Sequence, residues 1–192
     1  MRYSVTNDKR NNVECSLYLI SCLICCVIEI FVFSKITFAN ESLQTIWIIF
    51  QCAFSLSPVA IVALLKWIAS KFLLKIVKIE NLSGIYKVCI ESNYKGKTTF
   101  EATIQIKQTF DNINIIFSTD KSSSRAINAQ LDNSGIYTKL YYTYINEGDA
   151  TDKKNKTHVG TCTLTFINKR IEGNYYNNSR DRQTYGSIKS IK

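Results

Sequence analysis

The sequence has very little histidine and proline, and its cysteines form no metal-binding pattern. It has one histidine, His158, and one proline, Pro58, in 192 residues. Its seven cysteines include no CxxC pair that is joined to a second such pair or to histidines, which zinc sites require. We therefore expect no metal and no cofactor, and we expect the thiols to act as small packing residues.

Enzyme motifs are also missing from the sequence. GxSxG, Walker-type loops, HExxH and DxD are all absent, and the carboxylates after residue 79 are scattered, mostly in turn-like segments. Because these groups are not paired at spacings that support acid–base or nucleophilic chemistry, we expect a protein that is not an enzyme.

Two long apolar runs fill the first third of the chain, at Val13–Phe33 and Leu43–Leu65. A membrane-spanning helix needs about 20 mostly apolar residues, and each run supplies that length. A cleaved signal peptide is the alternative for the first run. It is disfavoured because no small-x-small site follows Phe33 and a second run comes directly after. The sequence predicts a two-helix transmembrane hairpin over residues 1–78 and a separate domain over residues 79–192.

The distribution of basic residues predicts the orientation of this hairpin. The link between the runs holds one lysine and one glutamate, whereas basic residues lie outside both runs, so the positive-inside rule places both termini in the cytoplasm. The formal net charge of +9 indicates attraction to anionic lipid headgroups, and we expect no nucleic-acid polymer as partner. The flanking basic residues are Arg2, Lys9 and Arg10 before the first run and Lys66, Lys71, Lys75 and Lys78 after the second.

Each apolar run also carries a stripe of small or polar residues. Cys15, Cys22 and Glu29 are seven residues apart, and Gln44 and Gln51 share one face of the second helix. Such stripes are how membrane helices associate. Glu29 is expected to pair with Gln44 or Gln51, within or between protomers, and the alternative is that it snorkels to water.

Alternating polarity dominates the sequence after residue 79. Residues 100–107 and 161–166 alternate apolar and polar side chains, as half-buried strands do. Turn-forming clusters cut the region into about eight strands, which begin near Gly84, Thr98, Ile113, Ser124, Ile136, His158, Arg170 and Gln183. The pattern predicts a small eight-stranded antiparallel, lipocalin-like β-barrel, with a sandwich of two sheets as the alternative.

Several side chains fall on predicted inward faces of this barrel. Arg125 is in phase with Ala129 and Leu131, and a guanidinium there suits a phosphate-bearing ligand; the alternative is that it points to solvent. Inward tyrosines can stack on nucleobases, although tyrosine is common in strands in any case. Arg180 and Arg182 flank the last turn, at a barrel mouth or simply in a solvated turn. The candidate ligand-binding residues are Tyr86, Arg125, Tyr142, Tyr144, Tyr175 and Arg182.

Three short strand motifs accompany this order of parts. They are Leu82-Ser83-Gly84-Ile85-Tyr86, Ile171-Glu172-Gly173-Asn174-Tyr175 and Tyr185-Gly186-Ser187-Ile188. With the two apolar runs, they make the chain resemble the CD-NTase-associated effectors of bacterial CBASS antiphage operons. The family in question is the SMODS-associating effectors with two transmembrane helices and a β-strand-rich domain.

The resemblance implies a function. In that family a CD-NTase makes a cyclic dinucleotide on infection, the barrel binds it, the protein becomes a homo-oligomer and the inner membrane is disrupted, which causes abortive infection. It therefore implies a cyclic dinucleotide, a lipid bilayer and further copies of this chain as partners. The alternative function is a constitutive membrane-anchored adaptor, whose barrel has a solid core and binds a protein or peptide.

Overall fold

The chain divides into two units in the computed structural model. The structure describes residues 1–31, 41–55, 57–96, 98–120, 122–146, 157–168, 170–179 and 182–191. One unit comprises residues 9–77 and is helical. The other comprises residues 1–8 together with residues 78–192 and is built on β-strands.

The helical unit holds four helices: α1 (Arg10–Phe31), α2 (Glu41–Ser55), α3 (Ser57–Ile68) and α4 (Ser70–Ile76). Within the described ranges, only the stretch Arg10–Ile28 of α1 is long and apolar enough to cross a membrane, and α3 is a shorter apolar helix. The second predicted span falls on α2 and α3, and its assignment as a span stays a prediction.

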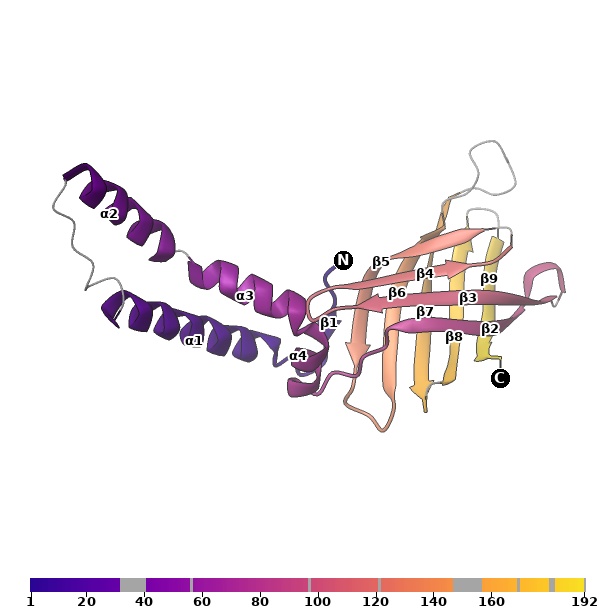
Figure 1. Ribbon diagram of the computed structural model, residues 1–192. Coiled ribbons are helices and arrows are strands. Elements are labelled where there is room, and N and C mark those ends of the chain that lie inside the picture. Colours follow the sequence, from indigo (N-terminus) through magenta and orange to yellow (C-terminus); the bar gives the residue numbers. More distant parts are fainter. Residues whose placement is uncertain are drawn as a thin grey trace. The chain divides into compact units, whose positions relative to one another are not determined.

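Helices α1 and α3 run side by side (Figure 1). Cys25 Sγ lies 3.2 Å from Ser57 Oγ, and Lys66 Nζ donates to Glu14 Oε1 at 2.9 Å. The packed face of α1 carries Ser21 and Cys25, which are 1% and 3% exposed.

Within this chain, α3 meets a different face of α1 from the predicted stripe, because Cys15 and Cys22 are exposed. Association through that stripe between protomers stays a prediction. Small residues occur on several faces of this helix, so spacing alone could not select the one that meets α3. The side chain of Glu29 lies outside the described residues. Gln44 is exposed and Gln51 partly exposed.

Eight antiparallel strands form the wall of the second unit (Figure 1). Each strand pairs with the next in sequence from β2 to β9, and β9 pairs with β2 to close the barrel. The predicted eight-stranded antiparallel barrel is thus confirmed, and the sandwich is excluded because the pairing continues around the whole wall. A 3₁₀ turn, Tyr94–Gly96, connects the strands β2 and β3. The strands are β2 (Gly84–Ser92), β3 (Thr98–Gln108), β4 (Ile113–Ser118), β5 (Ser123–Asp132), β6 (Thr138–Asn146), β7 (His158–Ile167), β8 (Arg170–Ser179) and β9 (Arg182–Ser190).

The two ends of the barrel interior differ in chemistry. At the end where β2 begins and β3 meets β4, the inward side chains are almost all apolar, and we call this the apolar end. At the other end, where β2 meets β3 and β6 meets β7, they include serine, asparagine and tyrosine, and we call this the polar end. The fully buried side chains of the apolar end include Ile106, Phe110, Ile113, Leu131, Leu140, Leu164 and Ile171.

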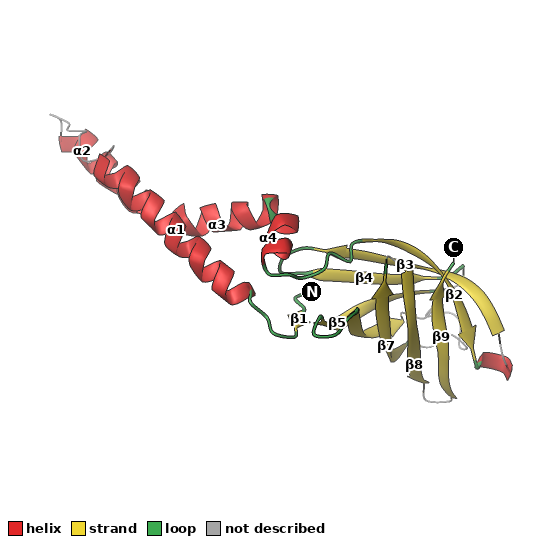
Figure 2. Cartoon of the chain, turned by 90° about the horizontal axis from the view of Figure 1, so that it is seen from below, coloured by secondary structure: helices red, strands yellow, loops and turns green. Residues whose placement is uncertain are grey.

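A ninth, very short strand precedes the helices. Strand β1 (Ser4–Val5) pairs in parallel with β5, Ser4 opposite Gln130 and Val5 opposite Leu131 (Figure 2). Strand β4 pairs with β5 only at residues 123–125, so β1 occupies the position beside the later part of β5. The sequence prediction grouped residues 1–8 with the transmembrane hairpin. The structure instead places them in the barrel unit, because β5 has a free edge that a strand can pair with.

Candidate ligand site inside the barrel

Three tyrosines gather inside the polar end of the barrel. Tyr142 and Tyr144 face inward from β6, with ring centroids 6.2 Å apart. Tyr175 faces inward from β8, and its hydroxyl donates to Ser92 Oγ on β2 at 2.6 Å. The structure thus brings together three of the four tyrosines predicted from alternation. We call these three residues the tyrosine cluster.

Glycines in neighbouring strands make room for two of these rings. A Cβ at Gly160 would collide with the phenol end of Tyr144, and one at Gly186 would lie 2.6 Å from Cε1 of Tyr175. Both rings therefore lie against bare backbone on the barrel wall, where a larger residue would push them away. The glycine positions fix the orientation of the aromatic faces.

Burial keeps this lining neutral. It raises the pKa of the Tyr142 and Tyr144 hydroxyls far above their ordinary value, and that of the Cys162 thiol to about 12. Burial also raises the pKa of Tyr175, although the hydrogen bond to Ser92 opposes this effect. At neutral pH the cluster therefore offers protonated hydroxyls and aromatic faces, and carries no charge.

Two asparagines extend the cluster and were not among the predicted site residues. Asn146 on β6 and Asn177 on β8 each follow an inward tyrosine by two positions, so they share its face. Asn177 is 9% exposed. Among the described residues, the side-chain oxygens of Asn146 and Asn177 are buried without a hydrogen-bond partner. The repeated Tyr-x-Asn spacing was the signal that could have found them.

Arg125 does not face the interior, and its prediction as an inward residue is wrong. A β-bulge between Ala126 and Asn128 shifts the register of β5 against β6. Ser124 is consequently buried and Arg125 exposed, whereas beyond the bulge Ala129 and Leu131 face inward. The sequence prediction assumed unbroken alternation along β5, and it therefore placed Arg125 on the inner face of the barrel.

Tyr86 lies apart from the tyrosine cluster. It is near the start of β2 at the apolar end, whereas Ser92, the partner of Tyr175, ends the same strand. Its hydroxyl donates to the carbonyl oxygen of Leu82 at 2.9 Å, and its ring meets Phe166 edge-on with centroids 5.8 Å apart. These contacts pack Tyr86 into the apolar end of the barrel, where β2 begins.

Positive charge is kept out of the described interior. Every lysine and arginine of β2–β9 whose side chain the structure describes is exposed. The backbone of Arg182 pairs with Ser179 at the polar end, but its side chain lies outside the described residues, as does Arg180. His158, paired with Asn146, is half-exposed at the same end. None of the described lysines and arginines of these strands therefore faces the interior.

Comparison with known proteins covers the barrel. Residues 77–192 match a family model described as "Cap15, cyclic dinucleotide receptor domain". This chain belongs to the Cap15 family. The matched segment includes β2–β9 and the tyrosine cluster, and it begins at the junction between the two units.

Two relatives of this Cap15-family chain are both named CD-NTase-associated protein 15. The protein from Yersinia aleksiciae is 30% identical over 122 residues, which are 62% of this chain and 58% of the relative. The protein from Staphylococcus schleiferi is 29% identical over 113 residues, which are 58% of this chain and 60% of the relative. The alignments thus span about three fifths of each relative.

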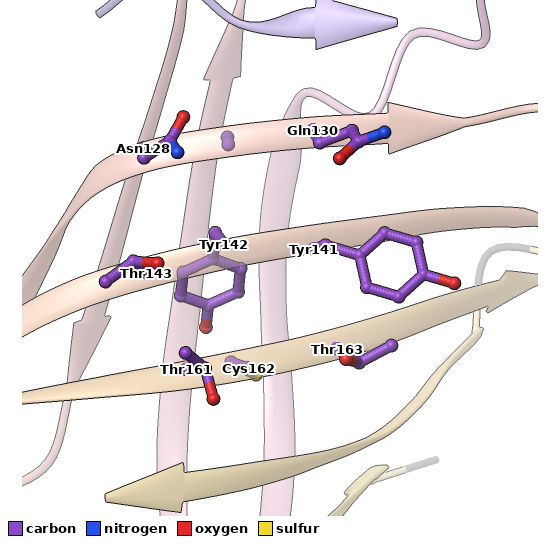
Figure 3. Close-up of a pocket in the computed structure, with 9 residues that line it drawn as sticks. Asn128, Gln130, Tyr141, Tyr142, Thr143, Thr161, Cys162 and Thr163 are labelled. Carbon is purple, nitrogen blue, oxygen red and sulfur yellow. The ribbon is translucent and has the colours of Figure 1, made fainter. Parts of the chain in front are cut away.

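A surface pocket on the outer wall provides a contrast with the interior. It measures about 290 Å³ and crosses β5, β6 and β7 (Figure 3). Its outward side chains alternate with the inward Tyr142 and Cys162, so it presents amides and threonine hydroxyls without buried aromatic faces. The interior cluster is therefore the better candidate for a nucleotide in this Cap15-family barrel. The outward side chains are Asn128, Gln130, Tyr141, Thr143, Thr161 and Thr163.

Proposed function

We propose that this chain is a CBASS effector whose barrel binds a cyclic dinucleotide at its polar end. The tyrosine cluster carries the proposal, together with the match of residues 77–192 to a cyclic dinucleotide receptor domain. Aromatic side chains that stack on bases contribute about 1–3 kcal/mol per base. The role is one of binding, with no chemical step on the ligand.

The phosphates of the ligand are expected at the rim. A phosphate diester buried in the neutral interior would lack a countercharge, which is costly. At the rim, the imidazole of His158 can donate a hydrogen bond and the backbone of Arg182 pairs with Ser179, whereas Arg125 lies on the outer wall. The bases therefore enter towards Tyr144 and Tyr175, and Arg182 remains the arginine proposed for a phosphate.

The membrane part of the proposal rests on the sequence. Helix α1 and the second apolar run form two spans in the bacterial inner membrane, with both termini and the barrel in the cytoplasm. Ligand binding favours a homo-oligomer, which requires that the ligand bind the assembled form more tightly than the monomer. Clustered hairpins then disrupt the bilayer. A CD-NTase supplies the ligand, as the names of the two relatives suggest.

Binding by full-length protein in detergent tests the receptor proposal. We expect Tyr144→Ala and Tyr175→Ala to weaken the tightest-binding cyclic dinucleotide at least tenfold. Tyr141→Ala and Tyr176→Ala are matched controls, because both tyrosines are exposed on the outer faces of β6 and β8. If the folded protein binds no cyclic dinucleotide, or if all four variants lose affinity alike, the interior is not the receptor site.

Assembly and membrane damage need separate measurements. With ligand, the molar mass of the protein–detergent complex is expected to rise, and dye is expected to leak from liposomes of anionic lipid. Glu29→Leu tests the polar pairing between spans and is expected to reduce both responses while leaving ligand affinity unchanged. Ligand-saturated protein that stays monomeric would contradict the proposed coupling.

A further inference from the structure

We infer that Asn177 and Asn146 read the edge of the bound base and select bases that carry an exocyclic amino group. This inference rests on the proposed function. It adds a specificity that neither the family match nor the tyrosine cluster provides, because aromatic faces stack on every base.

The barrel register places both amides beside the tyrosine cluster. Asn177 pairs with Gly160, and Gly160 pairs with Tyr144, so the side chains of Asn177 and Tyr144 face one another across a residue without a side chain. Asn146 is the next inward residue after Tyr144 on β6. The two amides therefore flank the ring on which a base would stack.

The hydrogen-bonding state of these amides points to a ligand that donates. Within the described part of the chain, neither Oδ1 has a donor, although both atoms are buried. Leaving a buried acceptor unpaired is costly, and the cost is recovered when a bound molecule supplies an N–H group. Asn177 is only 9% exposed, so the protein itself shields this acceptor from solvent.

Nucleobase chemistry identifies the complementary edge. Adenine presents its amino group beside N7, and an asparagine amide matches that edge with one accepted and one donated hydrogen bond. Guanine carries an amino group on its other edge. Hypoxanthine has a carbonyl oxygen in place of the amino group of adenine and a hydrogen in place of that of guanine. It is therefore a common reference for both bases.

The test measures affinities of full-length protein in detergent for cyclic di-AMP, cyclic di-GMP and cyclic di-IMP. The wild type is expected to bind at least one amino-bearing ligand tenfold or more tightly than cyclic di-IMP. Asn177→Leu and Asn146→Leu are expected to reduce this preference to less than threefold, mostly through the amino-bearing ligand. Asn174→Leu is the control, because Asn174 is exposed on the outer face of β8.

A second readout separates ligand recognition from folding. Without ligand, Asn177→Leu is expected to keep or raise the melting temperature, because it removes an unpaired buried acceptor. A lower melting temperature than that of Asn174→Leu would show that the amide serves the fold, and would overturn its assignment. Equal affinities of the wild type for all three ligands would overturn the inference but leave the receptor function intact. Binding of none of the three by a protein that binds another cyclic dinucleotide would also overturn the inference alone, whereas binding of no cyclic dinucleotide at all would overturn the proposed function.

Discussion

The buried amide of Gln108 joins the hydroxyl of Tyr3 across 105 positions of the chain. Its Nε2 donates to Tyr3 Oη at 3.1 Å, and its Oε1 accepts from the backbone N–H of Leu82 at 2.7 Å. Tyr3 lies just before α1 in the sequence and Leu82 shortly after α4. One side chain at the end of β3 therefore holds both chain segments that lead to the helical unit.

Gln108→Leu is expected to loosen both of these segments. It leaves the N–H of Leu82 without its acceptor and Tyr3 without its donor, so the free energy of unfolding should fall by about 1–3 kcal/mol. Hydrogen exchange should accelerate at residues 3–6 and 82–84. Gln105→Leu is the control, since Gln105 lies on the same strand but is partly exposed. Equal effects of the two substitutions would contradict the role given to Gln108.

Gly160→Ala is expected to displace the ring of Tyr144. The added Cβ would collide with the phenol group and would lie 2.7 Å from the backbone oxygen of Tyr176, which cannot move without distorting β8. Overpacking of this kind costs about 1–3 kcal/mol, and ligand affinity should fall with it. Gly135→Ala is the control, because the nearest atom to its Cβ is 3.8 Å away. Unchanged melting and binding in Gly160→Ala would refute this packing.

Stability is expected to fall as the pH rises above 9. Burial raises the pKa of Cys162 from 9.0 to about 12, so its neutral thiol stabilises the fold fully below pH 9. Between pH 9 and 12 only the unfolded state loses this proton, which costs about 1.4 kcal/mol per pH unit. The buried tyrosines add to the loss above pH 10, because their pKa values are also raised.

Melting curves between pH 8 and 11 check this expectation. Cys162→Ala should move the onset of the decline from about pH 9 to about pH 10, where unfolded tyrosines begin to ionise. Cys89→Ala, at a partly exposed position on β2, should leave the profile as it is. If Cys162→Ala has the wild-type profile, the thiol is not buried as described.

The contact between α1 and α3 can be captured as a disulfide. Cys25 Sγ lies 3.2 Å from Ser57 Oγ, so Ser57→Cys should form an intrachain disulfide with Cys25 under mild oxidation. The background carries serine at the six other cysteines to prevent other pairings, namely Cys15, Cys22, Cys26, Cys52, Cys89 and Cys162. Cys25→Ser in the same background is the control. A crosslinked dimer in place of a faster-migrating monomer would show that the two helices meet between protomers instead.

Strand positions could be predicted from the sequence because turn residues and alternation are local signals. The eight predicted strand starts lie within two residues of the observed ones, as for Gly84, Thr98, Ile113 and His158. Which side chains point into the barrel could be predicted only where apolar and polar residues alternate without interruption. It held along β6 and β8, which placed Tyr142, Tyr144 and Tyr175 correctly, and failed at the bulge in β5, which turned Arg125 outward.

The sequence by itself determined the apolar runs, the strand boundaries and the inward tyrosines, because each depends on neighbours within a few residues. Only the tertiary structure decided which residues meet across long separations. It paired β1 with β5, brought Tyr175 to Ser92, and buried the oxygens of Asn146 and Asn177 without a hydrogen-bond partner among the described residues. Such relationships depend on barrel closure and strand register, which arise from packing and hydrogen bonding between distant segments.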